Sequence, residues 1–215
     1  MENNQNWQTE FYRQLAQKSP QIIKNFKYVY GAILGVLILG GYFIFTSHPL
    51  SITFMTTIGK NLGRVALVLL GIVVLPGILG RFQIEIPITR IITLFRRQLG
   101  ITVFLLAFTH YQLVRGILIL SGQIPLFPRP LFEMLGTLSL FLLFFMFLTS
   151  NNFSVKKLGR WWKRLHRIVY LIIWLLVLHT GLQRISVWSI FIFIFATAEI
   201  VSWVYFFIRQ KVSSA

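Results

Sequence analysis

Residues 99–120 read LGITVFLLAFTHYQLVRGILIL, and residues 165–182 read LHRIVYLIIWLLVLHTGL. A helix needs about 17–25 predominantly apolar residues to cross a bilayer, and both stretches approach or reach that length. They nevertheless contain three histidines, His110, His166 and His179. An ionisable residue inside a membrane segment is costly unless it has a partner, so each histidine requires an explanation. The two stretches therefore predict membrane helices whose histidines have a specific role.

The composition of the whole chain also indicates a membrane protein. Of the 215 residues, 56% are hydrophobic and 12% are charged, against about 45–50% and 25% in soluble domains. Six apolar stretches occur, at residues 28–45, 62–82, 99–120, 131–148, 165–182 and 187–208. Backbone groups in lipid must bond internally, and these runs are continuous rather than alternating. We therefore predict an all-α, integral membrane six-helix bundle over residues 28–208, with tails at 1–27 and 209–215.

The charge distribution suggests how the bundle is oriented. The net charge is +16, from 21 Lys and Arg against 5 Asp and Glu. The basic residues flank the apolar runs, which favours a membrane surface over nucleic acid as the partner. With the N-terminus inside, sixteen of the 21 cations fall on inner segments. The positive-inside rule then predicts an inner-membrane, multi-pass protein with both termini cytoplasmic.

The N-terminal residues and the absence of cysteine bear on the role of the tail and on the cofactors that the chain can hold. Trp7, Phe11 and Leu15 are spaced four apart, so residues 1–27 are either a tail with an amphipathic helix on the membrane or a tail without a role. The first ten residues lack a basic n-region, and no cleavable signal peptide is expected. The absence of cysteine excludes disulfides, iron–sulfur ligation and c-type haem attachment.

The spacing of the histidines predicts a pair at one depth. His110 lies 13 residues after Arg97, and His179 lies 13 residues after His166. If Arg97 and His166 mark the inner ends of two parallel helices, His110 and His179 lie roughly 20 Å further out. Two imidazoles at one depth suit the axial positions of a six-coordinate b-type haem. The alternative is that each histidine hydrogen-bonds a neighbouring helix.

His166 and the other polar groups leave more than one interpretation open. No histidine lies 12–15 residues before His110, where Arg96, Arg97 and Gln98 stand instead, so His166 either binds an inner haem or caps its helix. On a straight helix it would also point some 140° away from His179. Arg115 and Arg184 each follow a histidine by five residues and either anchor haem propionates or extend to lipid headgroups. Glu199 is an intramembrane carboxylate that relays protons, pairs with a basic residue or stays neutral.

Several short motifs together resemble a known family. They are Arg96-Arg97-Gln98-Leu99-Gly100, Arg129-Pro130, Leu148-Thr149-Ser150, Leu158-Gly159, Trp162, Leu165-His166-Arg167, Tyr170-Leu171 and Leu178-His179. Taken together, over residues 60–182, they resemble the ferric reductase-like transmembrane domain superfamily. The most similar branch is that of the haem-binding subunits of bacterial methionine sulfoxide reductase systems (MsrQ/YedZ).

The resemblance implies a six-helix bundle with b-type haem between its third and fifth helices. It assigns His110 and His179 as outer ligands, His166 as the inner ligand, and electron transfer from a cytoplasmic donor to an outer acceptor. The segment 99–120 has one histidine where NADPH oxidases and many ferric reductases have two. Those proteins also continue into a flavin- and nicotinamide-binding domain, and only seven residues follow Ile208 here. We therefore expect a separate flavoprotein reductase or quinol as donor, and leave flavin binding open.

The sequence thus favours a membrane b-type cytochrome, an electron-transfer oxidoreductase subunit that works with an outer-side redox partner. Bis-imidazole ligation leaves no iron position for substrate, so the haem would act by electron tunnelling. Two other functions remain in competition. One is a stand-alone ferric or oxygen reductase at the outer face. The other is a haem-free transporter or assembly protein whose polar residues line a path.

Overall fold

The computed structural model describes residues 2–46 and 49–213, with side chains for residues 10–46 and 52–212. Within these ranges the chain is helical and contains no strand. Six helical spans are long and apolar enough to cross a membrane, judged by length and composition. They are Glu10–Phe45, Ile52–Arg81, Pro87–Leu120, Leu131–Leu148, Arg160–Gln183 and Val187–Val212. The predicted all-α bundle of six spanning helices is confirmed.

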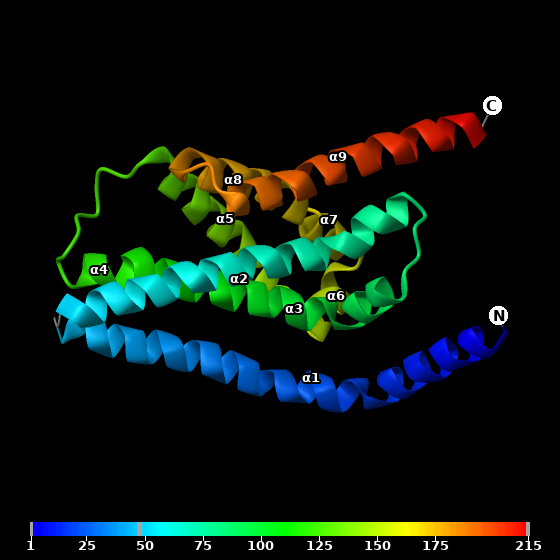
Figure 1. Cartoon of the computed structure of the whole chain (residues 1–215), viewed down its shortest axis with the longest axis horizontal. Coiled ribbons are helices and arrows are strands. Elements are labelled where there is room, and N and C mark those ends of the chain that lie inside the picture. The colour runs from blue at the N-terminus through cyan, green and yellow to red at the C-terminus, as the bar shows by residue number, and fades with distance from the viewer. Residues whose placement is uncertain (1, 47–48, 214–215) are drawn as a thin grey trace.

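The helices follow one another in the order shown in Figure 1. They are α1 (Glu2–Phe45), α2 (Pro49–Arg81), α3 (Pro87–Tyr111), the π-helix η1 (Gln112–Gly116), α4 (Ile117–Leu120), α5 (Leu131–Leu148), α6 (Asn152–Leu158), α7 (Arg160–His166), α8 (Val169–Gln183) and α9 (Val187–Ser213). The first spanning helix is longer than its apolar stretch, because α1 also includes most of the predicted N-terminal tail. The side chain of Trp7 lies outside the described residues.

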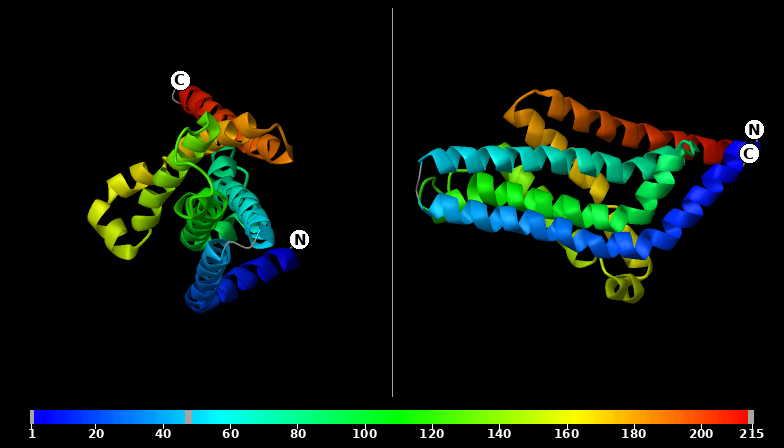
Figure 2. Two further views of the ribbon diagram at one scale, coloured as in Figure 1. Left: turned by 90° about the vertical axis from the view of Figure 1, so that its left-hand side faces the viewer. Right: turned by 60° about the horizontal axis from the view of Figure 1, so that its bottom comes forward.

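The connections gather at two opposite ends of the bundle (Figures 1 and 2). One end carries the loop at 121–130 and the connection at 184–186, and we call it the 121–130 end. The other carries the first and last described residues, the connection at 82–86, and α6 with α7; we call it the α6–α7 end. Both ends of the described chain therefore lie on the same side, as an even number of spans requires.

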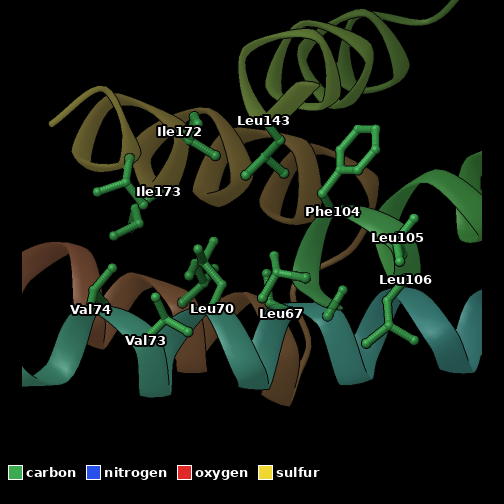
Figure 3. Packing of buried hydrophobic residues seen from close by; sticks show 14 of the residues in the cluster. Leu67, Leu70, Val73, Val74, Phe104, Leu105, Leu106, Leu143, Ile172 and Ile173 are labelled. Carbon is green, nitrogen blue, oxygen red and sulfur yellow. The ribbon is translucent and has the colours of Figure 1, made fainter. Parts of the chain in front are cut away.

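The helices that carry His110 and His179 each pack mainly on a different neighbour. The most extensive packing is between α2 and α3 and between α5 and α8. Figure 3 shows Ile172 and Ile173 of α8 and Leu143 of α5 facing Leu70 and Val73 of α2 across the core. In the described chain α3 and α8 do not pack closely on each other. The centre of the fold thus joins an α2–α3 pair and an α5–α8 pair through an apolar core, to which α1 and α9 also contribute.

Local sequence signals explain where the shorter helices begin. Asn151 caps α6, because its side chain accepts a 2.8 Å hydrogen bond from the Ser154 N–H. Gly159, with φ +48°, turns the chain between α6 and α7 in a conformation that favours glycine. The helix predicted from residue 165 is interrupted, since α7 ends at His166 and α8 begins at Val169. This break lies directly after one of the three histidines.

Candidate functional site

His110 lies on α3 and contacts the neighbouring helix α2. Its Nδ1 is 2.9 Å from the carbonyl oxygen of Gly59. A carbonyl can only accept, so Nδ1 carries the proton and Nε2 keeps its lone pair. Gly63, one turn further along α2, gives the ring its space, because a Cβ there would lie 2.8 Å from Nδ1. In the described residues Nε2 has no hydrogen-bond partner.

His179 on α8 has the same surroundings, provided by α5. Its Nδ1 is 2.6 Å from the carbonyl oxygen of Phe132, so this nitrogen also donates. Gly136 follows one turn later, and a Cβ at that position would lie 2.7 Å from Nδ1 and from Cε1 of the ring. Nε2 is again without a hydrogen-bond partner in the described chain. We call Gly59 with Gly63, and Phe132 with Gly136, the two carbonyl–glycine cradles.

The two cradles bear on both alternatives for the histidine pair. Each ring does hydrogen-bond a neighbouring helix, but only through Nδ1, and its second nitrogen stays free. His110 and His179 are also close enough to interact electrostatically. The two histidines that the sequence paired by depth thus lie within electrostatic range of each other. Histidines that ligate metals characteristically donate the other ring N–H to a carbonyl or carboxylate, as both rings do here.

His166 lies at the opposite end of the bundle, where its ring contacts side chains rather than a backbone carbonyl. Its Nε2 is 3.2 Å from the hydroxyl oxygen of Thr149. Its ring stacks on Trp162 at 4.1 Å between centroids, and the Trp162 indole N–H donates to the Thr149 carbonyl at 2.9 Å. Arg96 and Arg97 lie within electrostatic range, as the predicted common level requires. His166 is half-buried, and both a ligand role and a cap role are compatible with these contacts.

The helix break after His166 decides which way this histidine faces. On a straight helix it would point away from His179, but the turn at residues 167–168 removes that constraint. His179 contacts Phe132 near the start of α5, and His166 contacts Thr149 at its end. Both histidines of the α7–α8 segment therefore face the same helix at its two ends.

Arg115 forms an ion pair that the sequence analysis did not predict. It lies in η1, and its Nη1 is 2.5 Å from Oε2 of Glu133 in the first turn of α5. Its Nη2 also donates to the carbonyls of Pro125 and Leu126, each at 3.3 Å. An acidic residue in the first turn of a helix is favoured by the helix dipole, which was the available signal for Glu133. The pair joins the helix of His110 to the helix that cradles His179.

Arg184 has a different environment from Arg115. It ends α8, where its backbone N–H donates to the Thr180 carbonyl at 3.2 Å. Its side chain is exposed at the 121–130 end and forms no ion pair with a described residue. It remains available to an anionic group from outside the protein.

Glu199 pairs with a basic residue, one of the roles predicted for it. Its Oε1 lies 3.6 Å from Nη2 of Arg81, and both side chains are largely buried. Arg81 also donates to the Ser202 hydroxyl at 2.8 Å and to the Tyr170 hydroxyl at 3.1 Å. Its guanidinium lies 5.0 Å from the ring of Tyr170 and 4.7 Å from that of Trp203. This cluster ties α2, α8 and α9 together.

The replacement Glu133→Gln tests whether the pair with Arg115 stabilises the bundle. The side chains of Arg115 and Glu133 are 12% and 24% exposed. We expect the variant to lower the free energy of unfolding by about 3 kcal/mol, because it leaves a mostly buried guanidinium without its counter-charge. Thermal unfolding of the detergent-solubilised chain measures the loss.

The matched control is Glu85→Gln. Glu85 forms a 3.1 Å pair with Arg90, with side chains 80% and 64% exposed. An exposed pair contributes about 0–1 kcal/mol, so this variant should unfold nearly as the parent does. Equal shifts in the two variants would show that the Arg115–Glu133 pair has no special structural role.

Comparison with known proteins shows which relatives the sequence resembles. Relatives include the protein-methionine-sulfoxide reductase heme-binding subunit MsrQ of Agrobacterium fabrum. It is 37% identical over an alignment of 97 residues that covers 43% of this chain and 45% of that protein. The protein of the same name from Brucella ovis is 44% identical over 82 residues, 37% of each chain. The matches thus span less than half the length of these curated relatives. No solved structure matches the chain.

A family model provides the broader assignment. The model described as ferric reductase like transmembrane component matches residues 62–177. The match includes Gly63, His110, Gly136 and His166, and it ends two residues before His179. Because it covers more than half of the 215 residues, the chain belongs to the ferric reductase like transmembrane component family.

Proposed function

We propose that this protein is a membrane electron-transfer subunit that holds a b-type haem between His110 and His179. One observation carries the proposal. Two imidazoles close to each other each donate Nδ1–H to a backbone carbonyl and keep Nε2 free. The family and the printed name of the relatives, heme-binding subunit, support the same cofactor.

The donor set fits haem better than a bare metal ion. The described residues contain no group of three or more His or Glu side chains that could hold a metal by themselves. Iron in a porphyrin already has four nitrogen ligands and takes only axial ligands from the protein. Two imidazoles with fixed tautomers provide that pair. The cradles would hold the rings in one orientation before haem arrives.

The residues around the pair would tune and isolate the electron carrier. When bound, haem supplies a one-electron couple between ferric and ferrous iron. His110 and His179 would hold the haem iron between them, so the chain would transfer electrons without binding a substrate at the iron. Arg115 is already neutralised by Glu133, which leaves the exposed Arg184 as the freer partner for a propionate.

His166 is the proposed protein ligand of a second haem, at the α6–α7 end. It faces α5 as His179 does, and Arg96 and Arg97 are near enough to attract propionates. The competing role is a helix cap through the Thr149 hydroxyl. With His179 and His166 at opposite ends of α5, the chain would hold one electron carrier near each end of this helix.

The direction of transfer follows from the proposed orientation. We place the α6–α7 end and both termini on the cytoplasmic side of the inner membrane, in line with the positive-inside rule. A cytoplasmic flavoprotein reductase or a quinol would deliver electrons there. The acceptor at the 121–130 end would be a separate reductase subunit. The names of the relatives suggest that this partner reduces methionine sulfoxide in proteins.

A pyridine haemochrome assay on the purified chain and on His166→Ala tests both haem assignments. We expect the parent to show a Soret band that shifts on dithionite reduction, with two haems per chain. The variant should keep one haem, because His110 and His179 remain. The measured quantity is haem per chain, referred to protein determined by amino-acid analysis.

Two outcomes contradict parts of this proposal. A chain that binds no haem after expression with sufficient haem would overturn the electron-transfer function and favour a haem-free membrane protein. A count of one haem in both proteins would assign His166 to the Thr149 cap. The His110–His179 site would then stand alone.

A further inference from the structure

Residues 152–167, which comprise α6, Gly159, α7 and Arg167, form a surface that we call the basic hairpin. Its six cations are all exposed: Lys156, Lys157, Arg160, Lys163, Arg164 and Arg167. The sequence contains no acidic residue between Glu133 and Glu199. None of the six forms an ion pair with a described residue. The basic hairpin therefore presents positive charge that the described protein does not neutralise.

Each helix of the basic hairpin combines a cation with an exposed aromatic ring. On α6, the Lys157 ammonium lies 5.5 Å from the ring centroid of Phe153. On α7, the Arg164 guanidinium lies 4.6 Å from that of Trp161. The two aromatic residues are 71% and 59% exposed. Exposing two large aromatic rings to water is unfavourable. Aromatic rings with cations beside them are suited to a bilayer interface.

The basic hairpin is held firmly at the edge of the bundle. Arg97 donates to the Asn152 side chain at 2.6 Å, and the indole of Trp162 donates to the Thr149 carbonyl. Figure 2 shows that α6 and α7 project sideways from the bundle. The span that begins at Arg160 continues into α8. The exposed rings therefore lie close to the start of the apolar segment, at the level expected for headgroups.

We propose that the basic hairpin binds the headgroups of anionic phospholipids in the leaflet at the α6–α7 end. The phosphates would contact the cations, and the rings of Phe153 and Trp161 would lie among the upper acyl chains. An acidic soluble protein would satisfy the cations but would have to cover both rings at headgroup level. A lipid supplies negative charge and an apolar environment together. The proposal does not depend on haem.

The first test compares two variants that each lose three cations. The hairpin triple is Lys156→Gln, Arg160→Gln and Lys163→Gln. The control triple is Lys18→Gln, Lys24→Gln and Lys27→Gln, which removes exposed cations of α1. Spin-labelled phosphatidylglycerol reports lipid bound to the full chain in vesicles of phosphatidylcholine. The hairpin triple should lower the preference for phosphatidylglycerol by at least about tenfold, and the control triple should change it little.

The second test measures the depth of the rings. The sequence contains no cysteine, so Phe153→Cys introduces a single site for a spin label. In vesicles of phosphatidylcholine and phosphatidylglycerol the label should collide with oxygen more often than with a water-soluble nickel chelate. A label at Ile84→Cys, exposed in the connection between α2 and α3 at the same end, should show the opposite preference.

Either of two results would overturn the proposal. One is an unchanged lipid preference in the hairpin triple. The other is a label at position 153 that stays in water in anionic vesicles. If that label became shielded only after an acidic soluble flavoprotein was added, the basic hairpin would be a protein-docking surface instead.

Discussion

Replacing His179 or His110 by glycine is expected to abolish the six-coordinate haem spectrum of this chain. Each variant lacks one of the two axial imidazoles, and the described residues offer no third histidine at that level. We expect most of the haem bound at this site to be lost during purification. Any haem that remains should be five-coordinate. Absorption spectra of the oxidised and reduced proteins measure both effects.

Added imidazole separates loss of a ligand from loss of the fold. Glycine leaves a space of the size of the missing ring, so free imidazole should restore the six-coordinate spectrum in each glycine variant. The parent, treated in the same way, should not change. If both variants kept the parent spectrum without imidazole, the assignment of His110 and His179 as ligands would be wrong.

Alanine at Gly63 or Gly136 should weaken haem binding by about 10–100-fold, the range typical of lost outer-shell support for a ligand. A Cβ would lie 2.8 Å from the His110 ring or 2.7 Å from the His179 ring. Each ring would have to move away from its cradle and lose the carbonyl hydrogen bond. Titration of haem into haem-depleted protein measures the affinity.

Two glycines on the histidine helices themselves provide controls. Gly100 lies on α3 and Gly181 on α8, and a Cβ at either position would meet nothing within 4 Å. Alanine in a helix interior is favoured over glycine by about 1 kcal/mol, so these variants should bind haem normally and unfold no earlier. If Gly63→Ala and Gly136→Ala matched them in haem affinity, the cradles would have no role in ligand positioning.

Hydropathy was sufficient to predict the spans but not their ends. Lipid cannot hydrogen-bond the backbone, so each long apolar run had to be a helix, whatever its neighbours. The same argument does not apply outside the hydrocarbon. Residues 10–27 are too polar to be recognised as part of a span, yet α1 includes them because a helix continues readily into water. The break at residues 167–168 carries no proline or glycine that would have indicated it.

The candidate site also has some features that the sequence predicts and others that it does not. The common depth of His110 and His179 follows from the constant rise of a helix, and it was predictable from spacing alone. Their hydrogen-bond acceptors were not predictable, because a backbone carbonyl is present at every residue and leaves no mark in the sequence. The pairing of Arg115 with Glu133 depends on how η1 lies against α5. The pairing of Arg81 with Glu199 depends in the same way on the contact between α2 and α9.

The sequence by itself determined the number of spans and the polar groups placed at membrane depth, because both depend on local composition and on helix geometry. Tertiary structure decided which nitrogen of each histidine is free. It also decided which glycines make room for the rings and which cations are already neutralised. These properties depend on the rotation and separation of helices far apart in the sequence, which are set by packing between side chains across the core.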